Sequence, residues 1–291
     1  MRIAAFAAAD GPHLGIVEGD SLLDVSAAAP ELPRDLPTLL AGPGLEALSA
    51  ARTDALRHDV AGLALLAPTG RPPKFLAIGM NYRDHIAETG REPPEHQLWF
   101  NKQTTCVIGP GAAIEVPGRW STQVDYEGEL GVVIGKRCRH VPAERAREVI
   151  AGWVVVNDVS VRDWQRNSPT FTLGKSWDTH GPIGPWMVTT DEIGDPHRLG
   201  IRTWVNGDLR QDGNTSDLIF NCWQMIEHLS TVFTLEPGDL LSTGTPAGVG
   251  MARTPPAWLE AGDTVRIEIE GIGVLENPVI DEPHPGPQGL G

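Results

Sequence analysis

The side chains of this chain best suited to chemistry are acidic residues that recur at every second position between residues 124 and 134. Asp125, Glu127 and Glu129 alternate there with apolar residues such as Tyr126 and Leu130, the pattern of a strand with one buried face. Carboxylates two residues apart on a strand lie about 7 Å from each other on the same face. Two interpretations follow: an edge strand with a solvated acidic face, or a strand that supplies carboxylates to a site.

A further carboxylate stands at the end of a second apolar run. Asp158 follows Val154-Val155-Val156-Asn157, a sequence typical of a strand buried on both faces. If Asp158 meets Glu127 and Glu129, each pair of charges repels by about 4 kcal/mol at about 4 Å and an effective dielectric of roughly 20. Such a cluster needs a cation or a proton between its members. Carboxylates without Cys or His favour Mg²⁺ or Mn²⁺ over Zn²⁺, so we predict a metal site with positions open to substrate.

A histidine and a glutamate stand three residues apart in the segment 81–88. In a helix that begins near Asn81, His85 and Glu88 lie on one face within contact range. A carboxylate in contact with a histidine orients the ring, and the ring can then act as a general base. An exposed pair on a surface helix is the alternative, and the sequence by itself favours neither.

Three further segments carry polar groups suited to substrate binding. Lys175, between a glycine and a serine, is either a substrate contact or a surface lysine. The loop 242–250 offers hydroxyl groups and backbone N–H groups that could hold a carboxylate, although a plain Gly/Pro turn explains it equally well. A helix that begins after Asp158 would carry Arg162 and Gln165 on the Asp158 side.

The elements that must position these residues are mainly strands. Strand patterns outnumber helix patterns after residue 100 without regular strand–helix–strand alternation, which predicts a β-rich α+β fold. The longest amphipathic helix is predicted over 218–233. We expect a small N-terminal α/β domain at 1–70, a catalytic domain at 71–280 that begins with the linker Arg71-Pro72-Pro73, and a flexible tail at 281–291.

Bulk composition limits the possible functions. The 291 residues carry a net charge of −15, which opposes binding to nucleic acid and to anionic membranes. An anionic substrate stays possible if a metal ion and local Lys or Arg residues reverse the potential at the site. No apolar run reaches the length of a membrane span, and no GxGxxG or Walker A motif predicts a nucleotide cofactor. The cysteines Cys106, Cys138 and Cys222 have no metal-type spacing and imply no disulfide framework, which predicts a cytoplasmic protein.

Taken in order, these segments resemble the fumarylacetoacetate hydrolase superfamily, in its fumarylpyruvate/acylpyruvate hydrolase-like branch. The resemblance covers about residues 74 to 280, and residues 1–70 resemble the variable N-terminal domain of many members. The matching motifs are Gly79-x-Asn81-Tyr82-x-x-His85-x-x-Glu88, Asp125-Tyr126-Glu127-x-Glu129-Leu130, Asn157-Asp158-x-Ser160-x-Arg162-Asp163-x-Gln165, Gly174-Lys175-Ser176-x-Asp178, Pro182-x-Gly184-Pro185 and Thr243-Gly244-Thr245-Pro246-Ala247-Gly248.

The resemblance implies a mixed β-sandwich roll, a Mg²⁺ or Mn²⁺ site and a homodimer. It also implies roles for nine residues by position: Glu127, Glu129 and Asp158 as metal ligands, His85 and Glu88 as the dyad that activates water, Lys175 as support for a developing enolate or a substrate carboxylate, and Arg162, Gln165 and Thr245 as substrate-orienting groups.

The activity implied by the resemblance is hydrolysis of a C–C bond in an acylpyruvate or another 2,4-dioxo acid, with diketo-deoxy sugar acids among the candidates. The bond would break through a metal-stabilised enolate, and a water molecule needs a base such as His85. The same site could instead decarboxylate oxaloacetate-like acids or isomerise 2-hydroxy-diene-dioates. A non-catalytic protein of the same fold is disfavoured, because all the site residues are retained. In each enzymatic case the partner is a small anionic keto acid whose acyl group the sequence does not identify.

Overall fold

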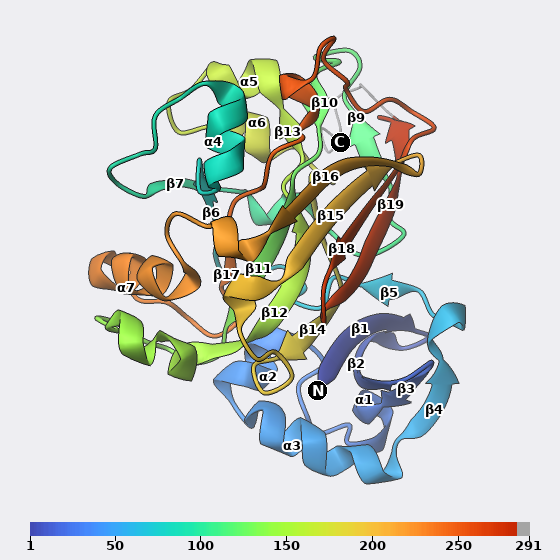
Figure 1. Ribbon diagram of the computed structural model, residues 1–291. Helices are drawn as coiled ribbons and strands as arrows, with labels where there is room; N and C mark the ends of the chain where they lie inside the picture. Colours follow the sequence, from blue (N-terminus) through green and yellow to red (C-terminus); the bar gives the residue numbers. More distant parts are fainter. Residues whose placement is uncertain (284–291) are drawn as a thin grey trace, which may run out of the picture.

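A computed structural model describes residues 1–283 of the chain (Figure 1). Within these residues the strands form three sheets of twelve, five and two strands, and short helices lie at their ends and sides. The prediction of a β-rich α+β fold is therefore confirmed. The predicted tail lies outside the described residues from 284 onward, while Asp281 itself ends a strand.

The largest sheet runs through both the N-terminal and the later part of the chain. Arg2 pairs with Val188 and Ile3 with Met187, so the N-terminal strands extend the main sheet. The division into residues 1–70 and 71–280 stays a prediction. The main path of the sheet is, in spatial order, β4 (Leu56–Asp59), β3 (Ser21–Asp24), β2 (Gly11–Glu18), β1 (Arg2–Ala8), β14 (Gly181–Thr189), β12 (Ile150–Asn157), β11 (Gly128–Ile134), β17 (Leu240–Ser242), β6 (Phe75–Gly79) and β7 (Leu98–Asn101); β5 (Leu65–Leu66) pairs with β1 and β8 (Val107–Ile108) with β14.

The two smaller sheets complete the β structure. Residues 264–269 alternate in burial: Val265, Ile267 and Ile269 are buried, while the residues between them are half-buried. The members of these sheets are β16 (Asp208–Asn214), β15 (Gly200–Val205), β18 (Thr264–Ile269), β19 (Gly273–Asp281) and β9 (Ile114–Val116) in the five-stranded sheet, and β10 (Val124–Asp125) with β13 (Ser160–Val161) in the two-stranded one.

Strands β11 and β12 lie at the centre of the molecule, and every residue of both is buried. Their alternating side chains enter two different cores: Trp153 and Val155 join one hydrophobic cluster, and Val154 and Val156 join another. The interpretation of residues 124–134 as an edge strand with a solvated acidic face is therefore wrong. Burial on both faces explains the apolar runs of these strands.

The single strand predicted over 124–134 is interrupted. β10 pairs with β13, whereas β11 pairs with β12, and Tyr126-Glu127 joins them outside either strand. The backbone N–H of Glu127 donates to the side-chain oxygen of Asn157 at 3.1 Å, and its carbonyl accepts from the N–H of Asp158 at 2.9 Å. These bonds hold the two acidic residues side by side where the strands change partner.

The helices are short, and two differ from prediction. Asp158 is followed by strand β13, so the helix expected there begins later, at Arg162. The helix predicted over 218–233 begins at Cys222 because the Asn221 side chain caps it and Gln224 completes a capping box. The helices are α1 (Val25–Ala28), α2 (Leu36–Ala41), α3 (Gly44–Ala51), α4 (Arg83–Thr89), α5 (Arg162–Arg166), α6 (Thr172–Lys175) and α7 (Cys222–Val232).

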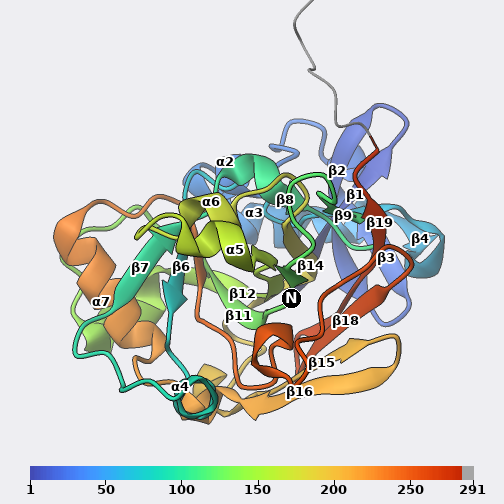
Figure 2. The same ribbon diagram turned by 90° about the horizontal axis from the view of Figure 1, so that it is seen from above.

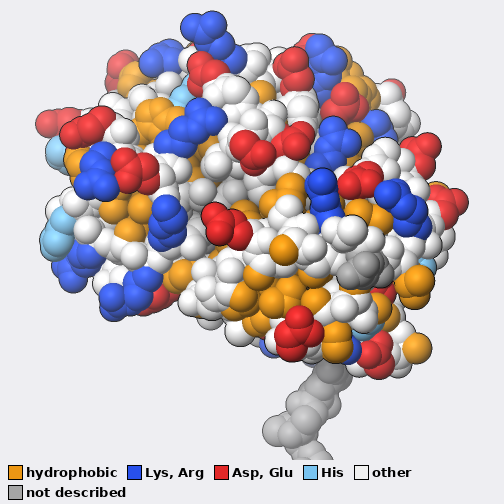
Figure 3. Space-filling view, turned by 90° about the horizontal axis from the view of Figure 1, so that it is seen from below, with side chains coloured by type: hydrophobic (Ala, Val, Ile, Leu, Met, Phe, Trp, Pro, Cys, Tyr) orange, Lys and Arg blue, Asp and Glu red, His pale blue; other side chains and the backbone are white. Residues whose placement is uncertain are grey.

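Two views show where these elements lie. Helices α4, α5 and α6 share the upper end of the molecule in Figure 1, and Figure 2 looks down on that end. Figure 3 shows the opposite face, on which Lys and Arg side chains lie among Asp and Glu side chains. None of the helices in residues 1–283 combines the length and the apolar character needed to cross a bilayer.

Candidate active site

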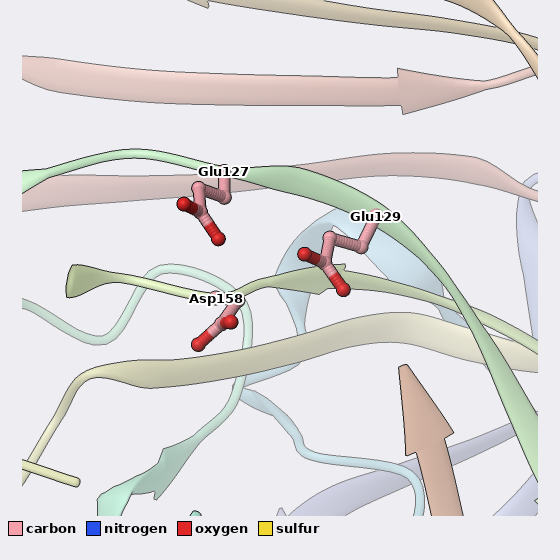
Figure 4. Close-up of side chains that lie close together, drawn as sticks. All are labelled: Glu127, Glu129 and Asp158. Carbon is pink, nitrogen blue, oxygen red and sulfur yellow. The ribbon is translucent and has the colours of Figure 1, made fainter. Parts of the chain in front are cut away.

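Three carboxylates gather where β11 and β12 meet. Glu127 directly precedes β11, Glu129 is its second residue, and Asp158 directly follows β12. One oxygen from each side chain lies within 4.8 Å of the other two, and all three residues are buried (Figure 4). The change of strand pairing after Asp125 therefore brings together the three side chains that the sequence singled out.

Buried cations surround two of these carboxylates. Lys175 Nζ lies 2.6 Å from Glu127 Oε2 and 2.7 Å from Asp158 Oδ2. Arg162 Nη1 lies 2.7 Å from Glu127 Oε1, and Lys102 Nζ lies 2.7 Å from Asp158 Oδ1. Lys102 also donates to the carbonyl of Lys175, so it ties the strand end to the helix that carries the second lysine. Both Lys102 and Asp158 have fully buried side chains.

Glu129 has a different environment. Within residues 1–283 no Lys or Arg forms an ion pair with it, and it accepts hydrogen bonds from the Ser242 hydroxyl and the Gly244 N–H. Burial, followed by the charges of Asp158 and Glu127, raises the pKa of Glu129 well above its ordinary value. Burial would also raise the pKa of Glu127, but the charges of its cationic neighbours outweigh that effect and hold this pKa low.

The donor set fits a divalent metal ion. The buried cluster contains the acids Asp125, Glu127, Glu129 and Asp158 but only three bases, so one negative charge is in excess when all are ionised. Glu129 is the acid without a cation, and oxygen donors suit Mg²⁺ and Mn²⁺. An ion at these three carboxylates would turn the excess negative charge into an excess positive one. The bases that complete the count are Lys102, Arg162 and Lys175.

The histidine–glutamate pair lies on helix α4. His85 Nδ1 is 2.8 Å from Glu88 Oε1, and the other oxygen of Glu88 accepts the N–H of Gly248 at 2.9 Å. The glutamate is thus fixed from two sides, and the contact at Nδ1 leaves Nε2 as the nitrogen for proton transfer. Both side chains line a cavity and keep 13% and 20% of their side-chain surface exposed. The shared cavity favours a role in the site over the alternative of an exposed surface pair.

That cavity has a volume of about 370 Å³ and joins the two groups. Its walls include His85, Glu88, Lys175 and the carboxylates Glu127 and Glu129. A base, an ammonium group and a cluster of carboxylates therefore face the same cavity. This arrangement can remove a proton from a bound molecule and stabilise the negative charge that develops.

The three residues predicted to orient substrate also line the cavity, but most of their polar atoms already have partners. Arg162 binds Asp125 through Nε and Nη2 at 2.9 and 2.8 Å, and its Nη1 donates to Gln165 Oε1 at 3.0 Å. The expectation that Arg162 and Gln165 face Asp158 is corrected, because Arg162 contacts Asp125 and Glu127. Thr245 accepts from the Gln211 side chain at 2.8 Å and donates to the Gly128 carbonyl at 3.0 Å.

The loop at 242–250 has a role that the sequence did not predict. Its backbone N–H groups bind the protein's own acids: Gly244 binds Glu129, Gly248 binds Glu88, and Gly250, together with Met251, binds Asp125. The sequence suggested that such groups hold a substrate carboxylate. The loop instead links the metal-type cluster, the histidine dyad and the arginine partner Asp125 in a fixed arrangement.

Lys102 and Asp125 are site residues that sequence reasoning missed or placed wrongly. Lys102 follows a short apolar stretch, and the partner that explains it, Asp158, is 56 residues away. Asp125 belongs to the acidic pattern, but it lies on the other sheet and binds Arg162. An acid and a base that face one another only after folding leave no local pattern in the chain.

Comparison with known proteins places these features in a family. The family model for the C-terminal part of fumarylacetoacetate hydrolase matches residues 74–280. An oxaloacetate tautomerase of Xenopus laevis is 41% identical over 290 residues, which cover 96% of this chain and 90% of that protein. That relative is described as mitochondrial. The cytoplasmic location predicted for this chain stays a prediction.

Solved structures agree with the match in sequence. A fumarylacetoacetate hydrolase from Exiguobacterium antarcticum superposes with a TM-score of 0.86 and 34% identity, over 97% of this chain and 100% of that one. A maleylpyruvate hydrolase from Sphingobium sp. SYK-6, solved with manganese(II) and pyruvate, gives a TM-score of 0.80 and 34% identity, over 97% and 99% of the two chains.

Proposed function

The chain belongs to the fumarylacetoacetate hydrolase family, and on that premise we propose that it is a metal-dependent tautomerase of oxaloacetate or a closely related 2-oxo dicarboxylic acid. The observation that carries the proposal is the shared cavity of the His85–Glu88 dyad, Lys175 and the carboxylate cluster. The oxaloacetate tautomerase relative, which is similar over nearly the whole chain, supports this choice of reaction.

The side chains of the cavity can perform the required proton transfer. Keto–enol exchange breaks a C–H bond next to the 2-oxo group and forms an O–H bond. His85 Nε2 would take the proton from carbon, while Glu88 stabilises the imidazolium ion that results, a contribution of about 100- to 10,000-fold in rate. The ammonium group of Lys175 would stabilise the negative charge on the oxygen until that oxygen is protonated.

Glu127, Glu129 and Asp158 would hold the metal ion, which we propose to be Mg²⁺ or Mn²⁺. When bound, such an ion supplies positive charge to the oxygens of a 2-oxo acid. Lys175 and Lys102 each pair with one oxygen of Asp158 at 2.7 Å. A homodimer, implied by the family resemblance, is part of the same proposal.

Hydrolysis of a C–C bond in an acylpyruvate is the second candidate. Its specific support is the doubly anchored Glu88, which fixes a histidine suited to activate water, and the maleylpyruvate hydrolase among the structural neighbours. In both reactions an enolate develops beside Lys175. They differ in whether His85 takes its proton from carbon or from water.

The two candidates give different products. We would incubate Mg²⁺-loaded protein with enol oxaloacetate, fumarylpyruvate and acetylpyruvate, and follow enol absorbance and product NMR. Decay of the enol faster than with Mg²⁺ alone, without new acids, supports the tautomerase. Pyruvate and a second acid from the acylpyruvates would favour the hydrolase. Metal-stripped protein and His85→Gln serve as controls, and rates equal to Mg²⁺ alone on all three compounds would refute both functions.

A further inference from the structure

We propose that Arg91 and Arg166 form a subsite for a second carboxylate, which makes the enzyme selective for 2-oxo dicarboxylic acids over 2-oxo monocarboxylic acids. This inference rests on the proposed function and assigns the residues that read the far end of the substrate. Both arginines line the cavity that contains the dyad and the carboxylate cluster.

The first argument is charge balance. Of the basic residues that line the cavity, Lys175 and Arg162 are paired with buried carboxylates and His85 with Glu88. Arg91 and Arg166 differ, because within residues 1–283 neither guanidinium forms an ion pair. The one side-chain contact seen for Arg91 is a weak one from Nη1 to Met80 Sδ at 3.7 Å. These two groups are the spare positive charges of the cavity in a chain of net charge −15.

The second argument is position. Arg91 follows the left-handed residue Gly90, at φ 66°, which ends the helix carrying the dyad. Its N–H donates to the Ile86 carbonyl at 3.3 Å, so its backbone is held against that helix. Arg166 is the last residue of α5, whose first residue is the buried Arg162. Each helix thus carries site residues along its length, and an exposed arginine at or just beyond its C-terminal end lines the same cavity.

The third argument is the apolar wall of the same cavity. The ring centroid of Phe100 lies 5.0 Å from Lys175 Nζ. Phe171 packs edge-on against Phe100, with the two ring centroids 6.0 Å apart. Met80 and Met251 add further apolar lining. A substrate whose 2-oxo acid end lies near Lys175 therefore meets an apolar surface suited to CH₂ groups. In the lining of the same cavity, the guanidinium groups of Arg91 and Arg166 offer the paired N–H groups that match a carboxylate.

The test is binding, so it does not depend on turnover. Calorimetry with Mg²⁺-loaded protein would compare two matched pairs, 2-oxopentanedioate with 2-oxopentanoate and oxaloacetate with 2-oxobutanoate. Each pair differs in the distal carboxylate. We expect the wild type to prefer the diacid. Arg91→Met and Arg166→Met should each weaken diacid binding roughly 10-fold and change monoacid binding less than about 2-fold.

The controls separate this subsite from the proposed function. Arg202→Met removes an exposed arginine that pairs with Asp212 outside the cavity, and it should change neither affinity. Equal affinity of the wild type for diacid and monoacid, or a diacid preference that survives in the double variant, would overturn the subsite. Arginine variants that lose the same affinity for the diacid as for the monoacid would also overturn the subsite. A protein that shows the preference but no tautomerase or hydrolase turnover would retain the subsite and lose the proposed function.

Discussion

The cavity has an inner end, formed by the buried carboxylates and their cations, and an outer end, formed by Arg91 and Arg166. The two ends balance their charges in opposite ways. At the inner end, Asp158 and Lys102 have fully buried side chains, and every acid except Glu129 has a cation within 3 Å. At the outer end, Arg91 and Arg166 are exposed and form no ion pair within residues 1–283. Apart from Glu129, the acids of the inner end are paired before a substrate arrives, whereas the arginines of the outer end have no paired anion within residues 1–283.

The supporting elements differ in the same way. The inner carboxylates stand at the ends of two strands whose residues are all buried, and these strands pair with each other and with strands on both sides. The outer residues lie on or beside α4 and α5, helices of seven and five residues. Breaking a buried pair leaves an uncompensated charge, while a change at an exposed arginine costs little stability. We therefore expect a substitution that breaks an ion pair of the inner cluster to cost more stability than one at the outer arginines.

The strongest test of this difference is Glu129→Gln at the inner end. The raised pKa of Glu129 means that a neutral amide resembles the protonated side chain, so thermal stability in EDTA should be nearly unchanged at about pH 5, close to the ordinary pKa of a glutamate. Changing a residue that only supports a metal ligand typically lowers metal affinity by up to about 100-fold. Glu129→Gln removes a ligand itself, so Mg²⁺ affinity should fall by more than that, and turnover should be lost. Calorimetry and thermal unfolding measure the two effects. The matched control is Glu148→Gln at the surface, and normal Mg²⁺ affinity in Glu129→Gln would contradict the assignment.

A change of the dyad should separate chemistry from metal binding. His85→Gln removes the base but not the carboxylates, so we expect turnover to fall by about 100- to 10,000-fold with Mg²⁺ affinity unchanged. His228→Gln, on the exposed side of α7, is the control. Full activity in His85→Gln would remove this residue from proton transfer, and a parallel loss of Mg²⁺ affinity would show that the dyad and the metal site are not independent.

The sequence predicted the inner site better than its surroundings, for a physical reason. Strand periodicity is a local pattern, so it can be seen in the sequence without knowledge of any long-range contact. It was therefore enough to single out Glu127, Glu129 and the apolar run before Asp158. The break at Tyr126-Glu127 was not predictable in this way, since it follows from a change of partner between two sheets. Local spacing likewise could not show that the amides of the glycine-rich loop bind the protein's own acids.

The pairing of Lys102 with Asp158 is also a long-range contact that local spacing could not predict, and it provides the next test. Lys102 and Asp158 have fully buried side chains, and Lys102→Met removes one of the two lysines paired with Asp158 and increases the excess negative charge of the cluster. The variant should therefore destabilise the metal-free protein, by at most about 3–5 kcal/mol because Lys175 remains. Urea unfolding in EDTA measures the change. Arg145→Met breaks an exposed pair with Glu148 and should leave the midpoint unchanged. If both variants unfold at the wild-type midpoint, the inner cluster does not depend on its cations.

The smallest effect expected is a pH dependence at Glu129 itself. Because burial raises the pKa of Glu129, the folded metal-free protein holds this proton more tightly than the unfolded chain does. As pH rises above the ordinary pKa of a glutamate, the unfolded chain releases the proton first, so this residue makes folding less favourable by at most about 1.4 kcal/mol per pH unit. This loss of stability stops once the pH exceeds the raised pKa of Glu129, because the folded protein has then released the proton as well. Unfolding of wild type and Glu129→Gln in EDTA from pH 5 upward should show the wild type losing stability relative to the variant. Saturating Mg²⁺ should remove the loss in the wild type, because a bound cation favours the ionised carboxylate, and parallel curves in EDTA would show that Glu129 is ionised without metal.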